Sequence, residues 1–278
     1  RWIGLIFISM AISLVIIDGT IVNTIFPAII NELHLSSSQV QWVQESYVLV
    51  FAALLLVWGS IADRFGRRRI LLIGIVLFIF ASVWASFATS DVTLIIARIE
   101  QGIGGAMVLP TTLALVNSNF QGKERGIAFA VWGSTIGGMV AVGPVLGGWL
   151  ATDFSWRWAF MINVPLGIII AIGLLIFVKE SKAETIQGKI DYVGAILSMV
   201  MFSFLVFGLI EGRNFGWWGI NETRRFEIFG YKWPTEGISV IPFALAISAA
   251  AFIAFYYWER KREAEGKSVL LDLSLFKI

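Results

Sequence analysis

The sequence predicts an all-α protein that crosses a membrane several times. Hydrophobic residues make up 58% of the 278 positions and charged residues only 14%, whereas soluble domains carry about 25% charged residues. Apolar runs long enough to cross a hydrocarbon core of ~30 Å recur between short polar breaks. These runs are too long for barrel strands and do not alternate with a period of two residues, so they favour helices.

Eight spanning helices are expected, each bounded by a polar, basic or aromatic break. The first contains a single formal charge, and the second ends in an arginine-rich loop. The third and fourth are separated by a short polar turn, and the fifth follows a basic break. The sixth follows a tryptophan-rich turn, and the last two flank a long loop. Their expected ranges are 3–30, 41–62, 70–88, 92–117, 126–150, 158–178, 191–211 and 237–258.

Lysine and arginine fall mostly in the segments that would share one side of the membrane, including residues 64–69, 123–125 and 179–189. The positive-inside rule therefore places the N-terminus in the cytoplasm. The protein is expected in the cell (inner or plasma) membrane, in contact with the lipid bilayer. The net charge of +2 indicates no nucleic-acid surface.

Four regions are expected along the chain. Residues 1–178 form a six-helix bundle, and 179–190 form a hydrophilic cytoplasmic linker. Residues 191–258 form two additional helices joined by an outer loop at 212–236, which is expected to fold as a small hairpin or interfacial cap. Residues 259–278 are expected to be a cytoplasmic segment that leads to a C-terminal bundle, so that the chain is the N-terminal portion of a longer protein.

Asp18 lies in the middle of the first apolar run. An ionised group at the bilayer centre costs at least ~2.5–3.5 kcal/mol on insertion scales, and such groups mark functional sites. Asp18 is therefore expected to face a water-filled cavity and to change protonation. The alternative is a fixed hydrogen bond to Thr20, Asn23 or a neighbouring helix.

Arg98 is the second charge inside an apolar run, and it lies about two turns from a helix end. Its long side chain either reaches the membrane surface or faces the bundle near Asp18. Glu100 is either its partner or a residue at a polar edge. The polar residues expected to line a cavity are Thr20, Asn23, Glu100 and Gln101.

Two glycine-containing stretches indicate contacts between helices. The loop GSIADRFGRRR, residues 59–69, combines glycines with charged residues: Gly59, Asp63, Arg64, Gly66, Arg67 and Arg68. Asp63 can pair with an arginine or cap a helix. In the fifth apolar run Gly133, Gly137 and Ala141 recur every four residues, which favours close helix packing. Pro144, which follows Gly143, removes a backbone hydrogen bond and permits a bend.

These stretches resemble motifs of the major facilitator superfamily. The 59–69 loop resembles its signature G-x-L-a-D-r-x-G-r-k, with Ile61 at the leucine position, which implies a latch between two transporter halves on the inner side. Residues 98–104 resemble R-x-x-Q-G-x-G. Residues 143–148, with Gly143, Pro144, Gly147 and Gly148, resemble the antiporter motif G-P-x-x-G-G, although Met139 stands where a glycine is common.

Two further stretches narrow the resemblance to drug:proton antiporters with fourteen helices. Residues 18–27 resemble D-x-T-x-V-N-x-A-x-P, with Phe26 in place of alanine, and residues 156–167 resemble W-R-W-x-F-x-x-N-x-P-x-G. The resemblance implies a major facilitator N-terminal six-helix bundle, built as two inverted three-helix repeats, plus two additional transmembrane helices.

The function expected from these features is proton-coupled efflux of small hydrophobic, amphipathic or cationic compounds such as drugs and antiseptics. Protons are the coupling ion, no other cofactor or metal is expected, and Asp18 and Arg98 carry the coupling. The alternatives are export of a specific endogenous metabolite (an amino acid, siderophore or self-made antibiotic) and a non-transporting receptor or scaffold. An enzyme is not expected, because the chain has one histidine, no cysteine and no P-loop pattern.

Overall fold

Two groups of helices make up the structure, a computed structural model that describes residues 1–183, 190–221, 226–228, 231–234 and 236–271. The first unit spans residues 1–184 and the second spans residues 185–278. The division falls inside the linker expected at 179–190. In the described residues, eight helices are long and apolar enough to cross a membrane. The protein is a multi-pass, all-α membrane protein, as its composition predicts.

The first unit contains seven helical segments. They are α1 (Trp2–Leu33), α2 (Ser37–Phe65), α3 (Arg67–Ser86), α4 (Asp91–Asn119), α5 (Gly122–Asp153), α6 (Trp158–Met161) and α7 (Asn163–Phe177). Ser36 and Ser90 cap α2 and α4, since each side chain accepts a hydrogen bond from a first-turn amide. Gly66 makes the sharp turn between α2 and α3 with φ of 121°.

One expected helix, 158–178, is divided into α6 and α7. Pro165 supplies the physical reason, because it has no amide hydrogen to donate to the carbonyl of Met161 four residues earlier. The interruption places Asn163 at the first position of α7, where its side chain is buried in the bundle. Together, Trp158–Phe177 are still long and apolar enough for one membrane span.

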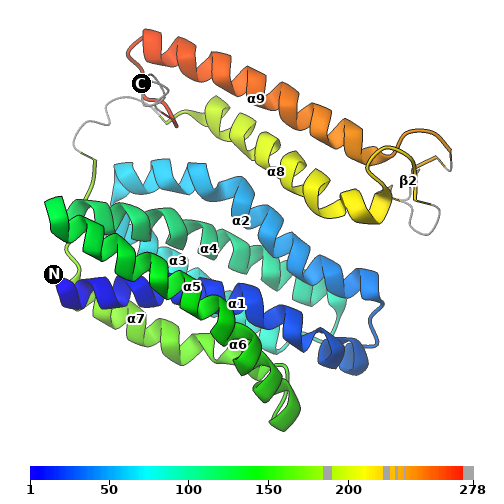
Figure 1. The fold of residues 1–278 in the computed structure, drawn as a ribbon, viewed down its shortest axis with the longest axis horizontal. Helices are drawn as coiled ribbons and strands as arrows, with labels where there is room; N and C mark the ends of the chain where they lie inside the picture. Colours follow the sequence, from blue (N-terminus) through cyan, green and yellow to red (C-terminus); the bar gives the residue numbers. More distant parts are fainter. Residues whose placement is uncertain (184–189, 222–225, 229–230, 235, 272–278) are drawn as a thin grey trace. The chain divides into compact units, whose positions relative to one another are not determined.

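The core of the first unit forms around α1, which packs against α5, α7 and α4 (Figure 1). Glycines bring α4 close to its neighbours. A Cβ on Gly102 would lie 2.9 Å from the Tyr47 carbonyl oxygen of α2, and one on Gly104 would lie 2.8 Å from the Gly74 carbonyl oxygen of α3. These approaches leave no room for larger side chains, so the glycines allow α4 to pack closely against α2 and α3.

Different faces of the first unit are exposed to different degrees. Large apolar side chains are exposed along α3 and α7, as expected for surfaces that face lipid. Helix α5 is also largely exposed, because its buried residues are only Ala128, Gly143, Gly147 and Leu150. Much of α5 therefore packs against nothing in this unit.

The second unit is a pair of helices, α8 (Tyr192–Phe215) and α9 (Val240–Ala264), which lie side by side in Figure 1. Between them, strands β1 (Glu227–Ile228) and β2 (Tyr231–Lys232) pair antiparallel, which confirms the hairpin expected in the 212–236 loop. Both helices of this unit end later than expected. Helix α8 continues to Phe215, and α9 continues beyond residue 258 because the charged residues that follow Trp258 are good helix formers.

Candidate functional site

The centre of the first unit contains a buried ion pair between α1 and α4. Asp18 and Arg98 both have 0% of their surface exposed, and an Arg98 amino group donates to the Asp18 carboxylate. Arg98 therefore faces the bundle and does not reach the membrane surface. The carboxylate is also not open to a water-filled cavity, which corrects the expectation from sequence. Protein groups enclose it instead.

Two amide side chains complete the surroundings of Asp18. The Asn163 amide donates to Asp18 Oδ1 at 2.8 Å and the Gln101 amide donates to the same oxygen at 3.2 Å. Both amides also donate to the hydroxyl oxygen of Ser82, at 3.1 Å and 2.7 Å. With Arg98, three donors from α4 and α7 contact one carboxylate, which is how a charge at this depth is compensated.

Arg98 has further partners on α2. Its second amino group donates to Gln44 Oε1 at 2.9 Å, and its Nε donates to the Val43 carbonyl oxygen at 3.3 Å. The guanidinium carbon lies 4.1 Å from the centroid of the Tyr47 ring, a cation–π contact. The Arg98 amino group that contacts Asp18 also donates to the Gln101 side-chain oxygen, at 2.7 Å. Apart from Asp18 on α1, the partners of the Arg98 charge thus lie on α2 and on α4 itself.

The remaining cavity candidates do not join this network. Thr20 donates to carbonyl oxygens of its own helix, at Ile16 and Ile17, and packs against Gly143 of α5. Asn23 is exposed on α1, and Glu100 is partly exposed on α4. Only Gln101 of the four candidates contacts Asp18.

The glycines of α5 divide into two sets. A Cβ on Gly147 would lie 2.8 Å from Ile21 Cγ1 and 3.0 Å from the Ile21 carbonyl oxygen, and one on Gly143 would overlap Thr20. These two glycines therefore pack α5 on α1. Gly133 and Gly137 are exposed, and a Cβ on either would meet nothing within 4 Å among the described residues. Pro144 is exposed within the same helix, and Gly148 has only an ordinary contact with Thr24.

The 59–69 loop is tied to the chain segment that follows α7. Asp63 pairs with Arg67 at 2.6 Å. The Glu180 carboxylate accepts hydrogen bonds from the backbone amides of Arg68 and Arg69, at 2.9 Å and 3.0 Å, and so caps α3. A Cβ on Gly66 would lie 2.8 Å from this carboxylate.

The other glycine and arginines of the loop have simpler surroundings. A Cβ on Gly59 would make only an ordinary contact with Pro110 of α4, at 3.5 Å. Arg68 also donates to the Val178 carbonyl oxygen at the end of α7, at 2.8 Å, and Arg64 lies in the last turn of α2.

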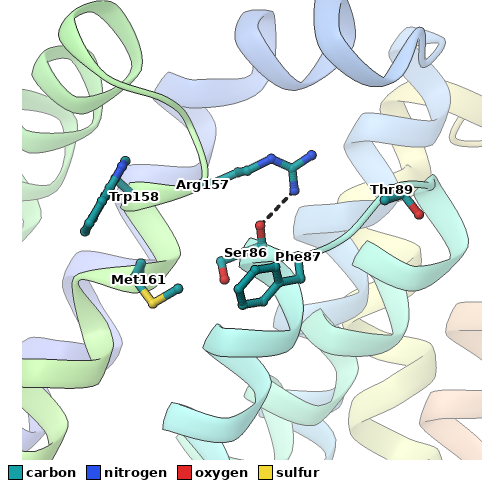
Figure 2. A pocket seen from close by; sticks show the side chains of 6 residues that line it. All are labelled: Ser86, Phe87, Thr89, Arg157, Trp158 and Met161. Carbon is teal, nitrogen blue, oxygen red and sulfur yellow. Dashed lines mark hydrogen bonds between the residues drawn. The ribbon is translucent and has the colours of Figure 1, made fainter.

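A pocket of about 390 Å³ lies at the ends of α3 and α6, away from the buried pair (Figure 2). Arg157 crosses it and donates to the Ser86 carbonyl oxygen at 2.7 Å, while its other amino group pairs with Glu32 at 2.8 Å. Exposed aromatic side chains of Phe87 and Trp158 form its walls. It contains none of the residues predicted to carry function.

Comparison with known proteins identifies the family. The sequence profile of the Major Facilitator Superfamily matches residues 8–271. The chain belongs to the major facilitator superfamily. A solved transporter structure has a similar fold. A bacterial homologue of the human lysosomal transporter Spinster, inward-facing and unoccupied, aligns with a TM-score of 0.53 and 18% identity over 94% of this chain and 63% of its own.

Similar proteins include some that are named as transporters or resistance proteins. A probable actinorhodin transporter of Streptomyces coelicolor is 33% identical over 100% of this chain and 45% of its own length. The lincomycin resistance protein of Streptomyces lincolnensis is 37% identical over 99% of this chain and 56% of its own. The tetracenomycin C resistance and export protein of Streptomyces glaucescens is 32% identical over 78% and 40%. The chain spans about half the length of these relatives.

Several residues of the buried network were not predicted from sequence. Ser82, Gln44 and Tyr47 are ordinary residues of apolar helices and gave no signal. Asn163 falls inside a quoted superfamily motif, yet nothing in its spacing connects it with Asp18, which lies 145 positions earlier. The available signal was a polar residue two positions before a proline in an apolar run.

Proposed function

We propose that this chain, together with a C-terminal six-helix bundle, exports small amphipathic or cationic compounds across the cell membrane in exchange for protons, with its N-terminus in the cytoplasm. The carrying observation is the buried Asp18–Arg98 pair, which joins two spanning helices at a depth where charge is expensive. Relatives that are named as transporters and resistance proteins support this proposal over an enzyme, receptor or scaffold.

In this arrangement the donors around Asp18 fit an ionised carboxylate, and two of them could also serve a protonated one. When Asp18 is ionised, it accepts from Arg98, Gln101 and Asn163. When it is protonated, the amides can turn and present their oxygens, because an amide side chain is both a donor and an acceptor. The Asn163 side-chain oxygen is buried and has no partner among the described residues, so an acceptor is already close to the carboxyl group.

Protonation would change the contact of α1 with α4. Arg98 would lose its only carboxylate partner in the network but would keep Gln101, Gln44 and the Tyr47 ring. Because Asp18 is enclosed, a substrate cannot compete for it directly in this arrangement. We therefore propose that the proton acts through the packing of α1 against α4, and that substrate binding favours the arrangement that releases the proton.

The alternation between inward and outward access requires a second bundle. We propose that the exposed Gly133 and Gly137 face of α5 packs against that bundle, and that the 59–69 loop is the latch between the two halves. Export of an endogenous metabolite remains a second candidate, which is favoured by the relative named as a probable actinorhodin transporter.

Dye efflux tests this proposal. The chain is joined to a C-terminal bundle, reconstituted in liposomes and supplied with a fluorescent cationic dye. A pH gradient should drive dye movement, and a protonophore should abolish it. Dye movement that continues unchanged after the gradient has been collapsed would contradict proton coupling, and no movement under any gradient would contradict efflux of this substrate class.

A further inference from the structure

A pair of buried carboxyl groups lies in the α8–α9 unit, where the first turn of α8 meets the end of α9. Asp191 is 6% exposed and caps α8, while Glu259 is 0% exposed and lies on the last two turns of α9. Nothing in the proposed transport mechanism uses either group. Their surroundings differ in a way that indicates different protonation.

Asp191 has the partners of an ionised carboxylate. It accepts from the Gly194 backbone amide at 2.9 Å and from the Trp258 indole at 2.9 Å. Arg262 of α9 supplies a positive charge at 3.2 Å. These donors come from both helices, so the charge of Asp191 is well compensated.

Glu259 has donors on one side only. Its Oε2 accepts from the backbone amides of Leu270 and Leu271, at 2.9 Å and 3.4 Å. Its Oε1 is buried and has no hydrogen-bond partner among the described residues. A buried carboxylate oxygen without a donor costs free energy, whereas a protonated oxygen in the same place needs an acceptor.

The acceptor is Asp191. The two groups converge on Gly194, because a Cβ built on that residue would overlap Glu259 Oε1 and would lie 2.5 Å from Asp191 Oδ2. Among the described residues, Asp191 is the charged group that lies against Glu259, Arg262 of α9 pairs with Asp191, and the segment after α9 contributes the backbone amides of residues 270 and 271. Arg262 therefore compensates the charge of Asp191, and a second ionised carboxylate beside it would be strongly repelled.

We propose that Glu259 and Asp191 form a proton-binding site, in which a proton on Glu259 Oε1 is donated to the Asp191 carboxylate. The protonated pair holds the end of α9 against the start of α8, and Glu259 Oε2 holds residues 270–271. Loss of the proton leaves two facing negative charges, so Glu259 turns away and releases the segment. The contact of residues 270–271 with the end of α9 is thereby made sensitive to pH.

Infrared spectroscopy and amide exchange test this proposal on the whole chain in lipid nanodiscs. At neutral pH the wild type should show the C=O stretch of a protonated carboxylic acid, and Glu259→Gln should remove that band. Glu263→Gln, a matched control one turn further along α9, should retain it. Asp191→Asn keeps a good cap for α8 but removes the repulsion, so it should also lose the band at neutral pH.

Amide exchange reports the consequence for the segment. In the wild type, the protection of residues 270–271, corrected for intrinsic rates, should fall by up to about tenfold as pH rises, the loss expected for a hydrogen bond to an uncharged group. Glu259→Gln can donate to Asp191 at every pH, so its protection should be high and independent of pH. The proposal would be overturned if the C=O band survived in Glu259→Gln. It would also be overturned if the protection of residues 270–271 in Glu259→Gln fell with rising pH as it does in Glu263→Gln. If added sodium or potassium ions alone restored protection at high pH, the site would be a cation site.

Discussion

Removing either member of the buried pair should destabilise the first unit strongly. Asp18→Asn preserves the size of the side chain and keeps an oxygen that Gln101 and Asn163 can contact. It leaves the Arg98 guanidinium, which has no exposed surface, with neutral partners only. Breaking a buried ion pair in this way costs about 3–5 kcal/mol, a large part of the 5–15 kcal/mol that is typical of a folded domain.

A double-mutant cycle separates the charge from the shape. Arg98→Met alone leaves Asp18 ionised and partly compensated, and should also cost several kcal/mol. The double variant Asp18→Asn/Arg98→Met removes both charges, so it should be more stable than the sum of the single effects predicts by about 2 kcal/mol or more. Reversible denaturant unfolding in detergent micelles measures all four proteins. Single variants within ~1 kcal/mol of wild type, or strictly additive effects, would refute this account of the network.

Three further predictions concern α5, the loop and the topology. Gly147→Ala should destabilise the first unit because its Cβ would press on α1. Gly137→Ala should leave the thermal unfolding of this chain unchanged and should reduce transport only by the protein that includes a C-terminal bundle. Equal effects of the two variants on unfolding would contradict the distinction between buried and exposed glycines of α5. Glu180→Ala should increase amide exchange at Arg68 and Arg69 by about tenfold, while Lys182→Ala, on the same segment, should not, and equal rates would show that Glu180 does not cap α3. A tag placed after Lys182 should be accessible only from the cytoplasm and a tag at position 219 only from outside, and the reverse result would overturn the N-in orientation.

The helices could be predicted from sequence because hydropathy acts locally. An apolar run must satisfy its own backbone in lipid, so length and composition alone located all eight spans. The predicted helix bounds that were wrong have local causes. Pro165 interrupts the sixth span, and the polar residues after Trp258 continue α9 although they are not apolar.

The buried site was only half predictable. The energetic cost of charge in an apolar helix identified Asp18 and Arg98 as candidates without any structure. Their pairing, and the enclosure of Asp18, depend on how the helices of the bundle pack, including the close approach of α4 to α2 and α3 that the glycines at positions 102 and 104 allow. Such contacts join residues far apart in sequence, and the pattern of one sequence does not contain them.

The central claim is that Asp18 carries the proton that is exchanged for substrate. The direct measurement is the number of protons released when a cationic dye binds to the purified protein that includes a C-terminal bundle, recorded with a pH indicator in weak buffer. The wild type and the control Asp153→Asn, an exposed aspartate at the end of α5, should release protons on dye binding. Asp18→Asn should bind the dye, if it folds, without proton release and without pH dependence. Unchanged proton release by folded Asp18→Asn would show that another group carries the proton.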